Sequence, residues 1–347
     1  MTDAVVFKDV DIIFGENPER ALAMVDAGKS REEIGSETSL VLGVAGASLT
    51  ITEGEILVLM GLSGSGKSTL LRAVNGLAPV VRGGVEVRTP SGPINPYKTS
   101  PKALRDFRMH TVSMVFQQFA LLPWRSVAEN VGFGLELAGM PDAERKTRVA
   151  EQLELVNLTR WADRKVNELS GGMQQRVGLA RAFATGAPIL LMDEPFSALD
   201  PLIRTRLQDE LLEFQRRLKK TIIFVSHDLD EAFRIGNRIA IMEGGRIIQC
   251  GTPQDIVKNP ANQYVADFVQ NMNPINMLTA RDVMQYGVAA ASGGVTATAR
   301  PDTPLVDVLD AMSKQPGQIG VVDNGAVIGT ISAQNVVEGL TQHRRRE

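Results

Sequence analysis

The order of apolar and polar positions divides the first part of the chain into strands and helices. Residues 4–14 are rich in β-branched and aromatic side chains, a pattern typical of a strand. Residues 16–39 carry apolar side chains at helical spacing, which predicts one or two short inserted helices. Residues 44–60 then predict a strand, a Glu-Gly turn and a fully apolar strand of the kind buried in parallel sheets.

The pattern changes twice further along the chain. Residues 79–101 are rich in Gly, Pro and Ser and predict short strands and turns, whereas residues 102–169 predict mainly helix. Strand and helix then alternate, which is typical of a parallel sheet covered on both faces. The elements expected there are helices at 171–185, 201–218 and 229–235, and strands at 188–193, 221–226, 238–242 and 246–249.

A smaller unit follows the alternating part of the chain. Asn and Pro residues gather after the helices of the larger unit, and residues 281–340 predict a β-α-β-β-α unit. About 60 residues are too few to bury a sheet face comfortably alone. We therefore expect a domain at 1–275 with a helical part at about 102–169, and a second domain at 276–347 that ends in the basic tail Arg344–Arg346.

Composition narrows the class of protein. A length of 347 residues is typical of about two domains, and 44% hydrophobic with 22% charged residues excludes collagen-like, disordered and disulfide-scaffold chains. The 37 basic and 40 acidic residues exclude a protein that coats nucleic acid through bulk positive charge. A single cysteine, Cys250, and the absence of a signal-type start predict a reducing cell interior. The sequence contains no run of about 18 apolar residues, so it predicts no membrane span.

A glycine-rich loop carries the strongest chemical signal. Residues 61–69 match G-x-x-x-x-G-K-[ST] between an apolar strand and a helix. The glycines let backbone N–H groups wrap the phosphates of a nucleotide, and the helix turns its positive end toward the anion. We expect Lys67 to reach the β and γ phosphates and the Ser68 hydroxyl to ligate Mg²⁺. The loop residues predicted to bind the nucleotide are Gly61, Ser63, Gly64, Ser65, Gly66, Lys67, Ser68 and Thr69.

Two carboxylates end the apolar strand expected at 188–193. A parallel sheet displays its chemistry at the carboxyl ends of its strands. We expect Asp193 to hold Mg²⁺ through water and Glu194, which points elsewhere, to polarise the attacking water as general base. Such a pair can also merely cap a neighbouring helix, but the phosphate loop in the same chain favours nucleotide hydrolysis.

Four further motifs complete a pattern that resembles ABC-type ATPases. Residues 169–176, LSGGMQQR, resemble the signature motif of that family, and Gln117 resembles its Q-loop glutamine. Ser197–Asp200 resembles the D-loop, and His227 resembles the switch histidine. The resemblance extends over about residues 4–270. It implies an α/β, P-loop NTPase fold with a mixed sheet and a helical subdomain, and ATP and Mg²⁺ as cofactors.

The resemblance also assigns roles around the phosphates. It implies that Gln117 touches the Mg²⁺ shell, together with Ser68 and Asp193, and that His227 contacts the γ-phosphate. A lone histidine after a strand is more often a structural residue, but its spacing after Asp193 favours catalysis. The catalytic residues expected are therefore Glu194 and His227.

A second anion site is expected at the start of the helix at 171–185. The hydroxyl and N–H groups of Ser170, Gly171 and Gly172 can bind an anion there. The resemblance implies a head-to-tail homodimer, in which one subunit's phosphate loop and the other subunit's signature hold each ATP, with Asp200 among the nucleotide-binding residues.

Aromatic residues suggest two further contacts. Phe14 stands about where members of the family stack an aromatic ring on adenine, although an insertion at 16–43 follows it. Phe119 and Trp124 follow Gln117, at a position that resembles the groove for a coupling helix of a membrane subunit. Leu121 between them is expected to be core.

Other segments resemble the ATPase subunits of bacterial quaternary-amine importers, which carry glycine betaine, proline betaine or choline. The resemblance lies in residues 16–43, Leu59–Gly64, Ala198–Arg204 and His227–Ala232. It implies a transmembrane permease, an extracytoplasmic substrate-binding protein, no nucleic acid, and a location on the cytoplasmic face of the inner membrane. The 17 aromatic residues form no visible cluster for cation–π binding, so we expect the partners to select the substrate.

The smaller unit resembles a single CBS repeat. Gly329–Asn335 resembles the adenosine-ligand motif of such domains, with Asn335 where an aspartate would hold the ribose. In related importers such a domain is associated with sensing ionic strength, and the basic tail would bind anionic lipid. A dimerisation module with a solvated tail is the alternative.

Three other functions stay open. One is a soluble ABC-type ATPase that acts on DNA or ribosomes, although about a hundred residues of mixed sequence, without long heptads, separate Gly61 from Ser170. Another is an importer of a different small solute. A small-molecule kinase is the third, and it would not explain the signature or His227.

Overall fold

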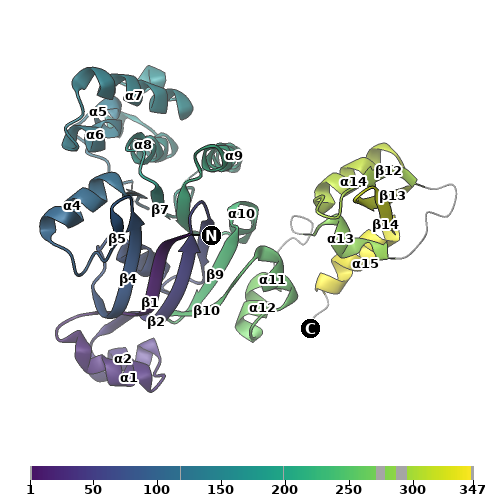
Figure 1. Cartoon of the computed structure of the whole chain (residues 1–347), viewed down its shortest axis with the longest axis horizontal. Helices are drawn as coiled ribbons and strands as arrows, with labels where there is room; N and C mark the ends of the chain where they lie inside the picture. Colours follow the sequence, from purple (N-terminus) through teal and green to yellow (C-terminus); the bar gives the residue numbers. More distant parts are fainter. Residues whose placement is uncertain (1, 118, 198, 271–277, 287–294, 345–347) are drawn as a thin grey trace. The chain divides into compact units, whose positions relative to one another are not determined.

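The computed structural model describes residues 2–117, 119–197, 199–270, 278–286 and 295–344. The chain divides into two units (Figure 1), the first made of the residues up to 227 together with 235–250, and the second of 228–234 together with 251–347. The domain boundary near residue 275 stays a prediction. Within the described residues, no helix combines the length and the apolar character that crossing a membrane requires.

A six-stranded sheet in the order β10-β9-β3-β8-β7-β6 forms the centre of the first unit's described part. The strands β3, β6, β7, β8 and β9 pair in parallel, so their carboxyl ends lie at one edge. The bounds are β3 (Ile56–Met60), β6 (Val112–Val115), β7 (Ile189–Asp193), β8 (Thr221–Val225), β9 (Arg238–Glu243) and β10 (Arg246–Gly251). The strands β3, β7 and β8 are buried along their whole length, as their apolar sequences predicted.

Strand β6 lies within residues 102–169, which the sequence predicted to be mainly helical, and it was not expected. Its four residues pair in parallel with β7, from Val112 opposite Ile189 to Val115 opposite Met192. Four residues are too short for a periodic signal, so this strand depends on its partner rather than on its local sequence.

A second, antiparallel sheet has the order β2-β1-β4-β5. Its strands are β1 (Asp3–Phe14), β2 (Val41–Thr52), β4 (Val80–Thr89) and β5 (Gly92–Ile94). One apolar core joins this sheet, the parallel sheet and helix α3 (Lys67–Ala73), with members such as Val5, Leu57 and Leu70. The helix that carries the phosphate loop is thus fixed by both sheets.

Short helices form the predicted insertion between β1 and β2, and Figure 1 shows them near the ends of these strands. They are η1 (Pro18–Ala21), α1 (Leu22–Asp26) and α2 (Arg31–Thr38). Ser30 begins α2 with a capping box: its hydroxyl accepts the N–H of Glu33, whose carboxylate accepts the N–H of Ser30. The insertion has an apolar core of its own, which includes Ile13, Val25 and Ile34.

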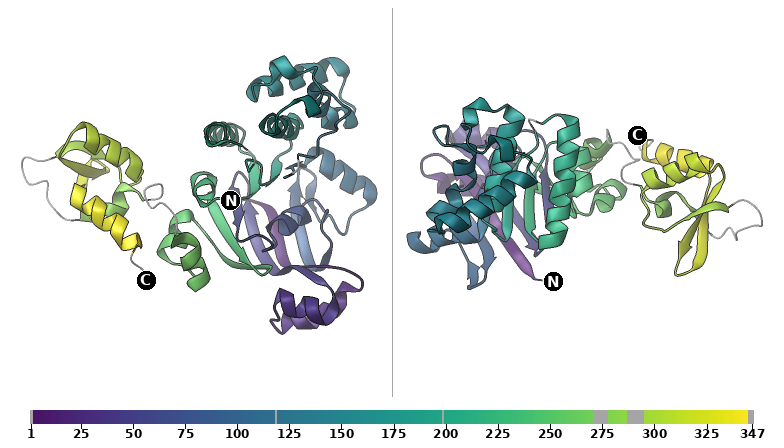
Figure 2. Two further views of the ribbon diagram at one scale, coloured as in Figure 1. Left: turned by 180° about the vertical axis from the view of Figure 1, so that it is seen from behind. Right: turned by 90° about the horizontal axis from the view of Figure 1, so that it is seen from above.

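The helical part of the first unit has a separate core. Figures 1 and 2 show its helices, in teal, gathered beside the sheets. They are α5 (Val127–Val131), α6 (Phe133–Leu137), α7 (Asp142–Leu155) and α8 (Gly171–Ala184), with η2 (Thr159–Trp161) and η3 (Val166–Glu168). Helix α4 (Pro101–His110) precedes β6, and α9 (Pro201–Leu218) follows β7.

The described part of the second unit contains helices and a small sheet, and its last element is a helix. The helices α11 (Pro253–Lys258) and α12 (Gln263–Gln270) were not expected, although a Thr252–Asp255 capping box with Pro253 at its first turn marks α11. The predicted β-α-β-β-α order is confirmed, with the short β11 in addition. Its sheet has the order β11-β14-β13-β12. The elements are α10 (Leu229–Ile235), α13 (Ala280–Val283), β11 (Gln285–Tyr286), β12 (Val295–Ala299), α14 (Leu305–Lys314), β13 (Gln318–Asp323), β14 (Ala326–Ile331) and α15 (Ala333–Arg344).

Candidate nucleotide site

The phosphate loop lies between β3 and α3 and depends on its glycines. Gly61, Gly64 and Gly66 have φ values of 140°, 80° and 102°, a region that favours glycine. A Cβ on Gly61 would overlap the carbonyl of Met242, and one on Gly66 would overlap the carbonyl of Gly43. The loop therefore has its shape because its neighbours approach the backbone closely.

A cavity of about 420 Å³ lies against this loop. It brings together most of the residues that the sequence placed around the phosphates, from four separate segments. Gly61 and Ser65 belong to the loop but do not line the cavity, and the Ser65 side chain is buried. The lining residues are Arg31, Ser63, Gly64, Gly66, Lys67, Ser68, Thr69, Gln117, Glu194 and His227. Only Arg31 among them was missed by the sequence analysis.

Lys67 is buried at the start of α3. Its Nζ donates to the carbonyl oxygens of Gly61 and Leu62 at 2.8 and 2.9 Å. Burial lowers the pKa of its ammonium, and the negative charges of Glu194 and Asp193 counteract part of that effect. The loop carbonyls thus hold the cation at the cavity wall, where it can exchange them for phosphate oxygens.

Asp193 is fully buried at the end of β7. Its Oδ1 accepts a hydrogen bond from Ser68 Oγ at 2.6 Å, and its Oδ2 pairs with a guanidinium nitrogen of Arg72 at 2.9 Å. A hydroxyl and a carboxylate that meet so closely are hard oxygen donors of the kind Mg²⁺ prefers, so the predicted pair fits this ion. Arg72, from the same helix as Ser68, compensates the buried charge and was not predicted.

Glu194 follows in a left-handed conformation, with φ 49°. Its N–H donates to the carbonyl of Val225 at 3.1 Å, which fixes the turn to the end of β8. The carboxylate Oε2 accepts from Gln117 Nε2 at 3.1 Å and lies 3.3 Å from His227 Nδ1. The structure therefore brings together Glu194 and His227, the two residues expected at the attacking water, and places Gln117, expected at the Mg²⁺ shell, against the same carboxylate.

Phe14 lies near the cavity without lining it. A Cβ on Gly43 would lie 2.9 Å from Phe14 Cε2 and 3.0 Å from Thr69 Cγ2. The Phe14 ring and the Thr69 side chain thus flank the same glycine, and 38% of Phe14 is exposed. An exposed ring beside the start of α3 is available to stack on a base.

The signature residues are separate from this cavity. Ser170 precedes α8 in an extended conformation and makes no side-chain capping bond, and a Cβ on Gly171 would meet nothing within 4 Å. Asp200 caps α9 by accepting the N–H of Ile203 at 3.1 Å. A Cβ on Gly172 would lie 3.1 Å from Leu199. Of the D-loop, Ala198 lies outside the described residues.

The aromatic segment after Gln117 divides only partly as predicted. Leu121 packs against the helical core, whereas 68% of Trp124 is exposed. Phe119 is half-buried with φ 57°, and Arg181 donates to its carbonyl at 2.6 Å. Trp124 is therefore the more accessible of the two candidates for a partner.

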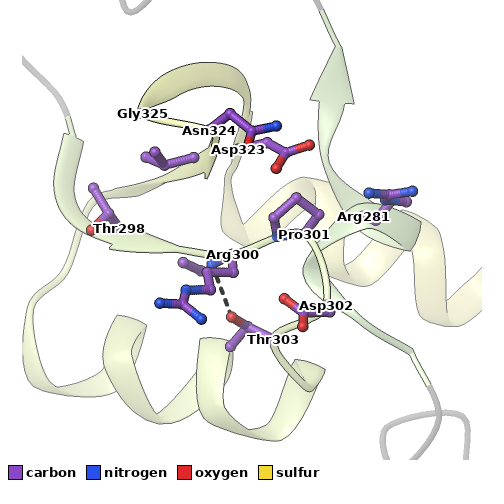
Figure 3. Close-up of a pocket in the computed structure, with 11 residues that line it drawn as sticks. Arg281, Thr298, Arg300, Pro301, Asp302, Thr303, Asp323, Asn324 and Gly325 are labelled. Atoms are coloured by element: carbon purple, nitrogen blue, oxygen red, sulfur yellow. Dashed lines mark hydrogen bonds between the residues drawn. The ribbon is translucent and has the colours of Figure 1, made fainter.

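A second cavity, of about 1030 Å³, lies in the second unit (Figure 3). Arg281 and Arg300 line it together with Asp302 and Asp323, so opposite charges balance there. Asn335 does not line this cavity: its Oδ1 accepts from the N–H and the hydroxyl of Ser332 at 2.9 and 2.7 Å. Of the basic tail, Arg345 and Arg346 lie outside the described residues.

The fold and the site together define an ABC-type P-loop ATPase. The defining features are the phosphate loop after β3, the carboxylates at the end of the parallel strand β7 and the glutamine and histidine that meet the second carboxylate. Residues 44–197 match the family model described as ABC transporter. Together with relatives of high identity, this match shows that the chain belongs to the ABC transporter ATP-binding proteins.

Two relatives align with nearly the whole chain. The glycine betaine/proline betaine transport system ATP-binding protein ProV of Escherichia coli (strain K12) is 44% identical over 97% of this chain and 82% of its own length. The trimethylamine N-oxide transport system ATP-binding protein TmoW of Ruegeria pomeroyi is 43% identical over 94% of both chains.

A solved structure supports the same fold. It is the dimeric structure of a post-hydrolysis state of an ATP-binding cassette bound to ADP and Pi. The TM-score is 0.61 at 30% identity, over 72% of this chain and 98% of that chain.

Proposed function

We propose that this chain hydrolyses ATP to drive the import of a quaternary amine, such as glycine betaine, proline betaine or choline, through a separate permease. The meeting of Glu194 with Gln117 and His227 beside the phosphate loop carries the hydrolytic part of this proposal. The relation to ProV, over 97% of the chain, supports the substrate class.

The geometry assigns a task to each side chain around ATP. Lys67 and the N-terminus of α3 bind the β and γ phosphates, with Phe14 available for adenine. Ser68 and Asp193 would hold Mg²⁺, with Gln117 at its shell, and this ion, when bound, neutralises charge on the phosphate oxygens.

Hydrolysis then depends on Glu194. Its carboxylate accepts a proton from water as the water oxygen attacks the γ-phosphorus, and His227 and Gln117 hold the water and the carboxylate in place. The bond from the γ-phosphorus to the bridging oxygen breaks, which yields ADP and inorganic phosphate.

A second copy of the chain supplies the rest of the site in this proposal. Ser170 and Gly171 do not line the cavity of their own chain, and their hydroxyl and N–H groups make no capping bond within the described residues. The solved cassette bound to ADP and Pi is dimeric, which supports a dimer here, and a head-to-tail arrangement would let these groups contact the partner's nucleotide.

The proposed permease would contact the helical part of the first unit, on the cytoplasmic face of the membrane. Trp124 is the exposed aromatic residue of the Gln117 segment, and Trp161 offers a matched control at 40% exposure. We expect Trp124→Ala to lower uptake about tenfold or more, as loss of an interface anchor does, while hydrolysis by the isolated subunit stays unchanged. Trp161→Ala should change neither. Loss of hydrolysis in Trp124→Ala would instead make this residue structural.

Trimethylamine N-oxide is a second candidate substrate. TmoW of Ruegeria pomeroyi is 43% identical to this chain and ProV of Escherichia coli is 44% identical, so identity hardly separates the two kinds of substrate. Both substrates carry a methylated nitrogen.

Uptake by cells that lack this gene tests the function directly. The cells receive labelled glycine betaine, choline, trimethylamine N-oxide or spermidine, and a plasmid restores the wild-type chain or Glu194→Gln. We expect glycine betaine or choline uptake to return with the wild type alone. Restoration of N-oxide uptake alone selects the second candidate. Spermidine dependence, or no dependence for any of the four, contradicts the assignment to methylated amines.

A further inference from the structure

Arg31 places part of the insertion at the nucleotide cavity. It is the first residue of α2, and its guanidinium donates to the backbone carbonyls of Leu42, Gly43 and Gly64, the last of these in the phosphate loop. It lines the same cavity as Lys67 and Glu194. The insertion therefore reaches the loop through a cationic side chain.

The positive charge of Arg31 has no carboxylate partner within the described residues. Its acceptors are three neutral carbonyls. A guanidinium has five N–H groups and stays protonated, so two N–H groups are left after these three bonds. A cation held by neutral groups at the wall of an anion-binding cavity has the chemistry to bind phosphate oxygens.

The insertion is anchored firmly enough to hold this cation in place. Arg82 of β4 pairs with the fully buried Asp11 of β1 at 2.5 Å and with Asp26 of α1 at 2.6 Å. Arg246 donates to the carbonyl of Val25 at 3.1 Å, and Ile34 of α2 is completely buried. Because its helix is already fixed, Arg31 loses little conformational freedom when a ligand binds.

We propose that Arg31 is a nucleotide-binding residue that contacts the phosphates of ATP, as a second cation beside Lys67. The insertion is then part of the nucleotide site rather than an appendage of the sheet. This inference rests on the nucleotide site described above, and it does not depend on the transported solute.

Titration calorimetry of the full chain with ATP, ADP and AMP tests the contact, with EDTA present to prevent hydrolysis. The variants are Arg31→Gln, which removes the charge, and Arg31→Lys, which keeps it. Arg20→Gln is the matched control, because Arg20 also belongs to the insertion and donates to the backbone carbonyl of Thr38. Thermal unfolding without nucleotide reports any loss of structure in each variant.

We expect Arg31→Gln to weaken ATP binding about tenfold, the size of one charge-assisted hydrogen bond, and to weaken AMP binding less. Arg31→Lys should keep most of the ATP affinity, and Arg20→Gln all of it. Equal losses in Arg31→Gln and Arg31→Lys would overturn the contact, because the three carbonyl bonds alone would then matter. Unchanged affinity in Arg31→Gln, or equal weakening for ATP and AMP, would also overturn it. Failure of the wild type to bind ATP would instead refute the proposed function.

Discussion

The N-termini of α3 and α8 can serve the same purpose, yet their surroundings differ. Neither helix has a side-chain capping bond at its N-terminus, so the first N–H groups of both are suited to binding an anion. A cavity lies around the start of α3, lined by side chains from the insertion, the Gln117 segment, the end of β7 and the end of β8. Around α8, Ser170 and Gly171 are exposed and no side-chain capping bond forms.

The start of α3 therefore belongs to a nearly complete nucleotide site, whereas the start of α8 forms only part of a site. The residues proposed for catalysis gather at α3, because the carboxyl ends of β7 and β8 place Asp193, Glu194 and His227 at the same edge. Helix α8 offers only hydrogen-bond donors. Hydrogen-bond donors without a catalytic group can bind a phosphate that another molecule supplies. We therefore expect the start of α8 to contact the nucleotide of a second subunit.

The largest effect is expected from Glu194→Gln, which removes the base and keeps the shape of the site at α3. Hydrolysis, measured as phosphate release, should fall by about 10²–10⁴, the range for loss of a general base. ATP binding should remain, and ATP-bound dimers should persist in size-exclusion chromatography. Rapid turnover in this variant would show that another group activates the water.

A charge at the start of α8 tests whether that helix end acts on another subunit. Gly171→Asp places a carboxylate where a Cβ meets nothing within 4 Å, at a position where acidic residues stabilise a helix. We expect normal ATP binding to the isolated chain but hydrolysis lower by about 10²-fold, because the partner's phosphates are repelled. Asn167→Asp, an exposed residue nearby, is the control for added charge.

Mixing two inactive variants then separates a site within one chain from a site between chains. Lys67→Ala removes the phosphate loop's cation, and Gly171→Asp blocks the signature. A mixed dimer has one site with both defects and one site with neither, so phosphate release should reappear on mixing. If the mixture stays as inactive as its components, the phosphate loop and the signature of one chain form a site within that chain.

The sequence predicted the motif residues well and their neighbours poorly. The phosphate loop, Glu194 and His227 were found because each has a fixed spacing from a strand end. Arg31 and Arg72 were missed because no motif includes them: tertiary packing brings Arg31 to Gly64, and the helical turn brings Arg72 to Asp193. Strand β6 was missed because four residues give no periodic signal.

The ion pair between Arg72 of α3 and the buried Asp193 gives the next prediction. Among the described residues, no such pair lies at the start of α8. Arg72→Leu leaves the buried carboxylate of Asp193 without its cation, and we expect the free energy of unfolding to fall by about 2 kcal/mol. In an Asp193→Asn background the same change should cost much less, because no buried charge remains. Equal losses in urea unfolding of both backgrounds would mean that Arg72 stabilises by packing alone.

The smallest effect concerns Asp200, which the D-loop motif assigns to the nucleotide and the structure assigns to the cap of α9. Asp200→Ala should lower the free energy of unfolding by about 1 kcal/mol, and Asp200→Asn should lower it hardly at all, since both Asp and Asn cap helices. A capping role alone predicts normal hydrolysis by Asp200→Asn. Slow hydrolysis in that variant, with unchanged stability, would show that the Asp200 carboxylate also acts across the proposed interface. The part of the site that one subunit offers to the other would then include the start of α9 as well as the start of α8.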